Sequence, residues 1–559
     1  MVYCGKPSKG CGECRSRKIR CDQAKPACSQ CTRAKRDCPG YRDQLSLMFR
    51  DESKSVVRKV TAASTLKNKR AERLPRTAVL EGNPVRSELS TPVVDPGFDF
   101  NTDPQHIYLM RQFEGFPLEI HPSQELETAK DEAICYFMRS NALPGSFWTS
   151  EIMSNFLLQS GGPASQRAMK ASMVATATAM LSRVRHLPSL GDVAHREYGS
   201  ALRLLNVALG DKEEAKTNQT LGAVIMLAVY EVITSRATED MESWINHING
   251  ATALLDIRGT DQLKTNAGLR LFLHLRYQIV SVIDHSFDLK LTPQQIISCL
   301  QRDARVPESL LECTKLVTFL QPAEAHGNRL TMILANLSNL RADIRTNMYE
   351  NEGDIVSAAS AIEADLIAWL AALPPEFNYT THTKSPFDFT FQKRFRGISS
   401  YDDQYHVYPS QWVCTSWNQY RSARIIVSDI ILSHVRRISD SSSVTSLSEE
   451  FRLHCRTLRL TIHRLAVEIC RSVPFHLNVH QTQSNPNLPP PESYLGGLVI
   501  LWHLFIAGVV ENPRHGLRRW VVKCLESIGH TMGIDQALAV ADVVASGLIS
   551  LDCVTEEED

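Results

Sequence analysis

The chain has 559 residues, of which 43 % are apolar and 22 % are charged, and its formal net charge is zero. This composition excludes a collagen-like chain and a wholly disordered one. The net charge of zero is the sum of a basic first segment and an acidic remainder. Residues 1–74 carry 19 Lys and Arg against 7 Asp and Glu, a net charge of +12, so the remainder carries −12. A basic segment ahead of an acidic body predicts contact with a polyanion such as nucleic acid.

Seven of the 15 cysteines lie close together near the start of the chain, from Cys4 to Cys38. Six of them follow the spacing C-x2-C-x6-C-x6-C-x2-C-x6-C, at Cys11, Cys14, Cys21, Cys28, Cys31 and Cys38. The second three repeat the spacing of the first three, so the cluster consists of two equivalent halves. Met1 to Gly10 lacks the hydrophobic segment of a secretory signal, so we expect a reducing compartment, in which such a cluster binds metal rather than forming disulfides.

The number of ligands predicts a binuclear cluster with two Zn²⁺ ions. Structural zinc takes four ligands in tetrahedral geometry, so two ions need about eight ligand positions. Six thiolates fill these positions only if two sulfurs each bind both ions, and the repeat favours one such bridge in each half. One four-cysteine site would leave two cysteines without metal, and even with Cys4 the chain has too few cysteines here for two separate sites. Because the segment is too small for a hydrophobic core, metal binding should supply most of its folding free energy.

Basic residues follow the second and fifth cysteines of this cluster. Four of the six residues between Cys14 and Cys21 are basic, namely Arg15, Arg17, Lys18 and Arg20. A rigid cationic turn of this kind suits DNA phosphates and the guanine O6 and N7 acceptors. The second half offers Arg33, Lys35 and Arg36 but is interrupted by Asp37, so we assign it mainly to phosphates. The alternative interpretation is a zinc knuckle whose charged face binds protein.

Residues 43–105 are predicted to be a basic arm followed by a proline-containing linker. Residues 43–74 are polar and basic, and residues 75–105 contain five prolines without helical periodicity. The apolar residues of the arm do not sustain a heptad, which leaves a monomer and a homodimer both open. Arg58-Lys59 and Lys67-Asn68-Lys69-Arg70 suit nuclear import and contact with phosphates equally.

From residue 106 to residue 559 the pattern predicts a large all-α domain. Trp244, Ile248, Ala251 and Leu255 form one apolar stripe, and Gly259 follows as a helix stop. Residues 221–233 read as a fully buried helix, and residues 417–435 as another amphipathic helix. Residues 494–510 are too short and too interrupted for a bilayer span, so we expect a buried core helix there and no membrane partner.

Other polar residues of this domain favour structural roles. Arg421 and Arg424 could hold an effector anion, but a buried structural ion pair is favoured. His247 is predicted to be a packed, hydrogen-bonded histidine, and the eight cysteines from Cys135 to Cys553 to be core residues. Phosphate-loop, dinucleotide-binding, zincin and nucleophile-elbow motifs are missing, so the sequence does not predict an enzyme.

The cysteine spacing, with Arg15-Ser16-Arg17-Lys18-Ile19-Arg20 inside it, resembles the fungal binuclear zinc-cluster (Zn2Cys6) transcription factors over residues 11–38. In that family the first and fourth cysteines bridge the metals, which implies Cys11 and Cys28. The loop proline of the family matches Pro26. Its base-reading residue matches Lys18, with Arg17 beside it. The resemblance implies recognition of CGG-like triplets in the major groove.

A second resemblance covers the body. Trp244 to Gly259, Trp417 to Arg424 and Arg518-Arg519-Trp520 resemble the helical regulatory domain that accompanies many such clusters. The whole chain is thus predicted to be a small Zn2Cys6 module at 1–42 followed by a large all-α regulatory domain. This implies a nuclear, zinc-dependent transcription factor for RNA polymerase II genes that binds double-stranded DNA and transcription machinery or co-regulators. Regulators of this type often control a metabolic or biosynthetic gene cluster. The alternative is a zinc-cluster adaptor without specific DNA binding.

Overall fold

The computed structural model of the chain describes residues 11–17, 19–22, 24, 27–39, 122–141, 161–236, 241–284, 305–321, 324–383, 400–441, 449–477, 493–547 and 551. The predicted arm and linker at 43–105 lie outside these residues, as do Cys4, Lys18 and Pro26. The chain divides into two compact units, and the smaller one is Glu52–Thr128. Of this smaller unit the structure describes only residues 122–128, the beginning of a helix.

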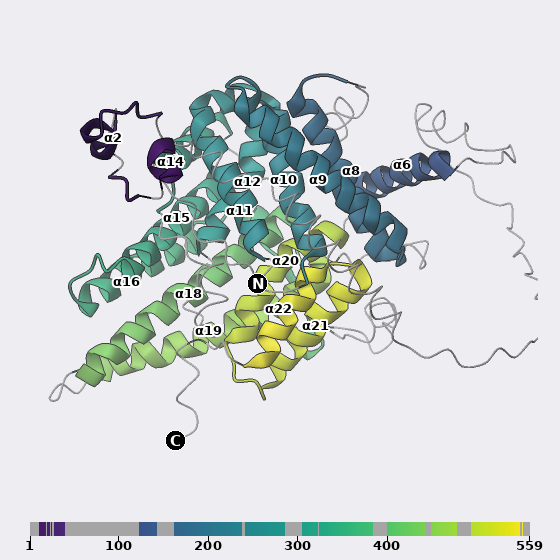
Figure 1. Cartoon of the computed structure of the whole chain (residues 1–559). Coiled ribbons are helices and arrows are strands. Elements are labelled where there is room, and N and C mark those ends of the chain that lie inside the picture. The colour runs from purple at the N-terminus through teal and green to yellow at the C-terminus, as the bar shows by residue number, and fades with distance from the viewer. Residues whose placement is uncertain are drawn as a thin grey trace, which may run out of the picture. The chain divides into compact units, whose positions relative to one another are not determined.

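The body consists mostly of α-helices, as predicted (Figure 1). Its α-helices are α6 (Pro122–Asn141), α8 (Ala164–Arg185), α9 (Pro188–Gly210), α10 (Asn218–Thr234), α11 (Met241–Arg258), α12 (Asn266–Asp284), α14 (Glu308–Leu320), α15 (Ala325–Arg345), α16 (Glu352–Ala371), α18 (Gln411–Ser441), α19 (Glu449–His476), α20 (Ser493–Val509), α21 (Gly516–Met532) and α22 (Asp535–Ser546). Short 3₁₀ turns are η2 (Glu214–Lys216), η4 (Gly259–Lys264), η6 (Pro375–Phe377) and η7 (Tyr401–Asp403).

Helices that are close in sequence pack against each other through most of the body. Helix α8 packs on α9 and α10, α16 on α18, α18 on α19, and α21 on α22. The C-terminal helix α22 also returns to α10. One connected apolar core runs through these contacts, from Ala133 in α6 to Leu551. The described part of the body therefore shares one main core.

The sampled helices occur where the sequence predicts them. Helix α11 contains the stripe from Trp244 to Leu255 and ends at Arg258, just before Gly259, whose φ of 55° is left-handed. Helix α10 is buried almost all round, which explains why its sequence is nearly continuously apolar. Helix α20 covers the predicted core segment, and its Ile500 and Leu504 are fully buried. All these predictions are confirmed.

A two-stranded antiparallel sheet was not predicted. Strand β1 (Thr380–Thr383) pairs with β2 (Gln404–Val407), with Thr380 opposite Val407 and Thr383 opposite Gln404. The exposed strand β1 reads Thr-Thr-His-Thr and has no apolar alternation, so hydrophobic periodicity does not reveal it, although threonine is common in strands. Phe387, Phe389 and Phe391, where the sequence does alternate, lie outside the described residues. Strand β2 packs against α19 and so anchors the hairpin to the body.

Candidate functional site

The six spaced cysteines gather into two groups of four thiols that share two members. The first group is Cys11, Cys14, Cys21 and Cys28, and the second is Cys11, Cys28, Cys31 and Cys38. Within each group all sulfurs lie within 4.8 Å of one another. Cys11 and Cys28 belong to both groups, which is the arrangement that six ligands for two ions require.

The spacing of the sulfurs fits tetrahedral zinc. The Sγ–Sγ distance is 3.6 Å for Cys11–Cys28, for Cys11–Cys31 and for Cys14–Cys28. A tetrahedral ion with Zn–S bonds of about 2.3 Å places its sulfurs about 3.8 Å apart. Burial raises the pKa of the Cys14 thiol to about 12. Because zinc binds thiolates, its binding must displace this proton, and zinc affinity should weaken in acid.

The backbone follows the same internal repeat as the cysteines. Helix α1 (Gly12–Ser16) corresponds to α2 (Ser29–Arg33). In each half a backbone N–H donates to the shared sulfur three residues earlier, Cys14 to Cys11 and Cys31 to Cys28, both at 3.4 Å. These donors favour negative charge on the two shared sulfurs. The two helices also end in the same way. The backbone N–H of Ile19 donates to the Cys14 carbonyl, and that of Arg36 donates to the Cys31 carbonyl, both at 3.0 Å.

Asp22 contacts the start of helix α2. The backbone N–H of Ser29, the first residue of α2, donates to both carboxylate oxygens of Asp22, at 3.1 and 3.2 Å, and the Ser29 hydroxyl also donates to this carboxylate. The hydroxyl hydrogen bond lowers the pKa of Asp22. A carboxylate at this helix start stabilises the orientation of α2, which carries Cys31. In the sequence, Asp22 gives no sign of this role, because it lies seven residues before Ser29.

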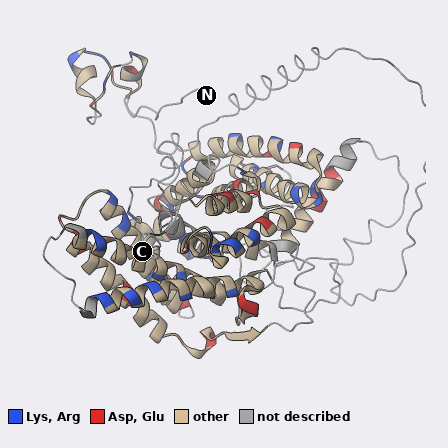
Figure 2. Cartoon of the chain, turned by 90° about the horizontal axis from the view of Figure 1, so that it is seen from below, with Lys and Arg blue, Asp and Glu red and all other residues tan. Residues whose placement is uncertain are grey.

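Basic residues lie on both halves of the cysteine-rich unit (Figure 2). The exposed ones are Arg17, Arg20, Arg33, Lys35 and Arg36. Arg15 lies in α1, and Lys18 is outside the described residues. Arg36 forms an ion pair of 2.8 Å with Glu13 of the opposite half. The repeat also places Asp37 at the position of Arg20, so the second half presents less positive charge than the first.

In the helical body Arg421 forms the centre of a buried polar cluster. Its guanidinium donates to the Tyr408 hydroxyl at 2.7 Å and to Asn418 Oδ1 at 2.8 Å, and it pairs with Glu468 at 3.4 Å. It also lies 5.2–5.8 Å from the ring centroids of Tyr379, Tyr408 and Trp417, within cation–π range. Arg421 is therefore structural, and the prediction of an ion pair is confirmed.

Other residues considered in the sequence also have structural partners. Arg424 pairs with Glu363 at 3.0 Å, and His247 Nε2 lies 3.2 Å from the Tyr198 hydroxyl. The described cysteines of the body are buried, except Cys135, which is exposed and corrects the prediction for that residue. Away from the cysteine-rich unit, the described residues contain no further group of three or more His, Cys, Asp or Glu placed to hold a metal. Across the described ranges, none of the helices is both long and apolar enough to cross a membrane.

Two buried histidines next to the Arg421 cluster predict a loss of folding stability in mild acid. Burial lowers the pKa of His476 and of His503 to about 3, with the Arg421 charge contributing. Both are therefore neutral in the folded state, whereas in the unfolded chain they bind protons below about pH 6.5. Folding stability should fall by roughly 1 kcal/mol per histidine for each pH unit between about 6 and 4. Urea unfolding at pH 7.5 and 5.5 measures this loss.

Two comparisons distinguish this effect of the histidines from general acid unfolding: the variant His503→Gln, and the different pH range in which Glu468 acts. His503 forms a hydrogen bond of 2.8 Å with the Ser422 hydroxyl, and His503→Gln should remove the share of the pH dependence that this histidine contributes, roughly 1 kcal/mol per pH unit. Although burial opposes its ionisation, the hydrogen bond from His406 and the Arg421 charge lower the pKa of Glu468 to about 2. The stability from Glu468 is therefore present above about pH 4.5 and is lost only below it. An unchanged pH dependence in His503→Gln would exclude the explanation.

Comparisons with known proteins identify the family. The family model of the fungal specific transcription factor domain matches residues 157–544, and that of the fungal Zn(2)-Cys(6) binuclear cluster domain matches residues 9–47. Transcription factor dbaG of Emericella nidulans is 28 % identical over 241 residues, 40 % of this chain and 54 % of the relative. White-opaque regulator 2 of Candida albicans is 44 % identical over 47 residues, 8 % of this chain and 10 % of the relative. Transcriptional regulatory protein moc3 of Schizosaccharomyces pombe is 44 % identical over 48 residues, 8 % of this chain and 9 % of the relative.

The chain thus spans about half the length of the first relative and about a tenth of the other two. No solved structure matches it. The family model of the helical domain nevertheless covers most of the chain, and the cluster model covers the six spaced cysteines. The chain therefore belongs to the fungal specific transcription factor family and carries a Zn2Cys6 cluster that binds two zinc ions.

Proposed function

We propose that the protein is a nuclear, zinc-dependent, sequence-specific transcription factor that reads CGG-like triplets at RNA polymerase II genes. The observation that supports this most is the pair of four-sulfur groups sharing Cys11 and Cys28, with exposed arginines next to them. The six cysteines of the two groups are the zinc ligands in this proposal, and the two shared ones bind both ions. Zinc, when bound, supplies the cross-links that hold α1 and α2 in place.

The first half of the cluster is proposed to read bases, and the second to hold phosphates. Lys18 and Arg17 contact guanine in the major groove, because their donors match its O6 and N7 acceptors. Arg15 and Arg20 hold phosphates beside them. In the second half Arg33, Lys35 and Arg36 contact phosphates, which set the orientation but carry no sequence information. The ion pair of Arg36 with Glu13 and the acid at Asp37 support this division of roles.

The helical body is proposed to regulate the DNA-binding module rather than to catalyse a reaction. In this arrangement residues 1–42 bind DNA, residues 43–105 connect, and residues 106–559 bind co-regulators or transcription machinery. A metabolic or biosynthetic gene cluster is the expected target. The chain binds DNA as a monomer or as a homodimer. Gel mobility of its complexes with duplexes that carry one triplet or two triplets distinguishes these cases.

Lys18→Ala should weaken binding to a CGG-containing duplex by about tenfold or more, because one good contact to a guanine contributes about 1–3 kcal/mol. Its binding to a scrambled duplex should barely change. Arg33→Ala is the matched control, because loss of a phosphate contact weakens binding to both duplexes alike and lowers the salt dependence by about one charge. Gel-shift titration of the full-length, zinc-loaded chain at two salt concentrations measures all of these quantities.

Two outcomes would refute the proposal. If Lys18→Ala binds the CGG duplex as tightly as wild type does, this residue does not read bases. If wild type binds CGG and scrambled duplexes equally at moderate salt, the protein is not a specific reader, and the adaptor interpretation replaces it.

A further inference from the structure

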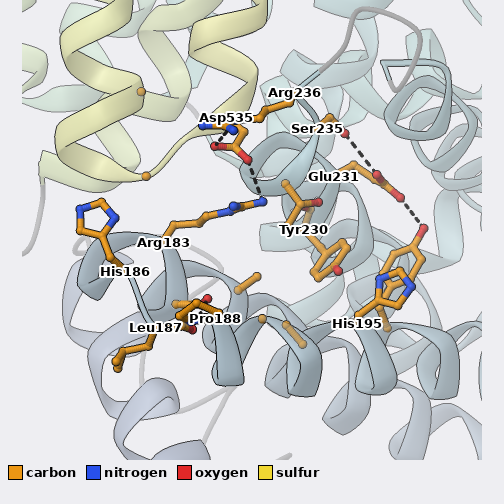
Figure 3. Close-up of a pocket in the computed structure, with 18 of the residues that line it drawn as sticks. Arg183, His186, Leu187, Pro188, His195, Tyr230, Glu231, Ser235, Arg236 and Asp535 are labelled. Carbon is orange, nitrogen blue, oxygen red and sulfur yellow. Dashed lines mark hydrogen bonds and ion pairs between the residues drawn. The ribbon is translucent and has the colours of Figure 1, made fainter. Parts of the chain in front are cut away.

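A pocket of about 770 Å³ lies where α8, α9 and α10 meet the turn between α21 and α22 (Figure 3). The turn approaches α8 closely at Gly533, which has a φ of 69°. A Cβ added there would lie 2.4 Å from the Cβ of Arg183. Only glycine therefore permits this contact. The volume is within the range of pockets that hold small organic molecules.

The two buried carboxylates of the pocket both have partners within the protein, but only Asp535 is paired with arginines. Asp535 pairs with Arg183 at 2.7 Å and lies 3.7 Å from Arg236. Glu231 accepts a hydrogen bond from the Tyr198 hydroxyl and one of 3.3 Å from Ser235. Figure 3 shows the guanidinium group of Arg183, from α8, reaching the carboxylate of Asp535. The charge of Asp535 is thus compensated by the protein itself, whereas Glu231 is held by hydroxyl donors.

The accessible charge at the Asp535 end is positive. Arg183 and Arg236 both pair with Asp535. Their side chains are 40 % and 69 % exposed, respectively. Exposed histidines also line the pocket, at His186, His195 and His530. Asp192 is the exposed acidic residue of the lining. An anion at this end would therefore meet two guanidinium groups without displacing a buried contact.

Apolar side chains lie along the same pocket. Leu187, which is 41 % exposed, is followed by Pro188, and Leu538 comes from α22. An exposed leucine gains free energy when an apolar group covers it. The pocket thus combines a cationic end with an apolar wall, which is the chemistry that recognises an amphipathic acid.

We propose that this pocket binds a small organic anion with a ring or other apolar body. The anion lies between Arg183 and Arg236, and the apolar body covers Leu187, Pro188 and Leu538. The bound molecule contacts α8, the end of α10 and the start of α22 together. It therefore stabilises the docking of the C-terminal helices on α8, and binding should raise the melting temperature of the body.

Isothermal titration of the full-length, zinc-loaded protein with 2-naphthoate tests the proposal. Wild type should bind one equivalent saturably. Arg236→Gln removes the more exposed arginine, leaves the Arg183–Asp535 pair in place, and should weaken binding about tenfold. Arg185→Gln is the matched control, because Arg185 is 49 % exposed, pairs with Glu132 at 2.6 Å and lies outside the pocket lining. Equal melting temperatures of the two variants without naphthoate establish that both are folded.

Two further probes separate charge from apolar contact. 2-Naphthalenemethanol has the same ring system without the charge, and acetate has the charge without the ring. Both should bind at least about tenfold more weakly than naphthoate. Absence of naphthoate binding, equal binding by wild type and Arg236→Gln, or equal binding of the alcohol overturns the proposal.

Discussion

Cys28→Ala is expected to release both zinc ions and to abolish DNA binding. Cys28 belongs to both four-sulfur groups, so its loss leaves each of them with three sulfurs. Zinc binding to a structural site of this kind contributes about 10–16 kcal/mol, and here it replaces a hydrophobic core. Native mass spectrometry of the full-length chain should count two zinc ions in wild type and fewer than one in the variant.

Cys14→Ala provides the informative contrast. Cys14 belongs to the first group alone, so the group of Cys11, Cys28, Cys31 and Cys38 stays complete and should retain one ion. Cys135→Ala, which changes an exposed cysteine of the body, should retain two. Retention of one ion by both Cys14→Ala and Cys28→Ala would contradict the sharing of Cys28.

Arg421→Ala should lower the free energy of unfolding of the helical body by about 3–5 kcal/mol. The side chain is 1 % exposed, and its removal leaves Glu468, Asn418 and the Tyr408 hydroxyl with a lost partner. Breaking a buried ion pair costs more than the pair contributes, because the remaining charge loses part of its compensation; Glu468 would keep only its contacts with His406, Tyr379 and Arg471. Urea unfolding followed by circular dichroism measures the change.

Arg437→Ala is the matched control for that experiment. Arg437 lies on the same helix, α18, but its side chain is 56 % exposed and it is 3.9 Å from Glu352. Exposed ion pairs contribute about 0–1 kcal/mol, so the stability should hardly change. A comparable loss in both variants, or none in Arg421→Ala, would contradict the structural role assigned to the Arg421 cluster.

A centre with two zinc ions and six cysteines could be predicted from the sequence, because its chemistry is local, whereas the choice of Cys11 and Cys28 as the shared sulfurs came from the family resemblance. The internal repeat of the cysteine spacing sets which thiols are equivalent. The coordination number of four for each zinc ion then requires shared sulfurs. The long helices were predictable for a similar reason, since a buried face repeats every three to four residues. Both signals are carried by residues that are close in the chain.

The features that sequence analysis missed depend on contacts between distant residues. Arg36 is an ordinary basic residue in the sequence, and only the fold brings it to Glu13, 23 positions away. The pocket requires Arg183 and Asp535 to meet, and their segments are far apart in the chain. Strand β1 is polar and short, so only its pairing with β2 defines it. Asp22 lies seven residues before Ser29, and the N-cap of α2 is Cys28, so the contact of Asp22 with the start of α2 also depends on the fold.

Zinc K-edge X-ray absorption of the full-length, zinc-loaded chain tests most directly whether two ions share Cys11 and Cys28. The expected spectrum has four sulfur neighbours per zinc at about 2.3 Å and a zinc neighbour within about 4 Å, since ions that share sulfurs must lie close together. A spectrum without zinc–zinc scattering, or with nitrogen and oxygen ligands, would contradict the shared-sulfur cluster.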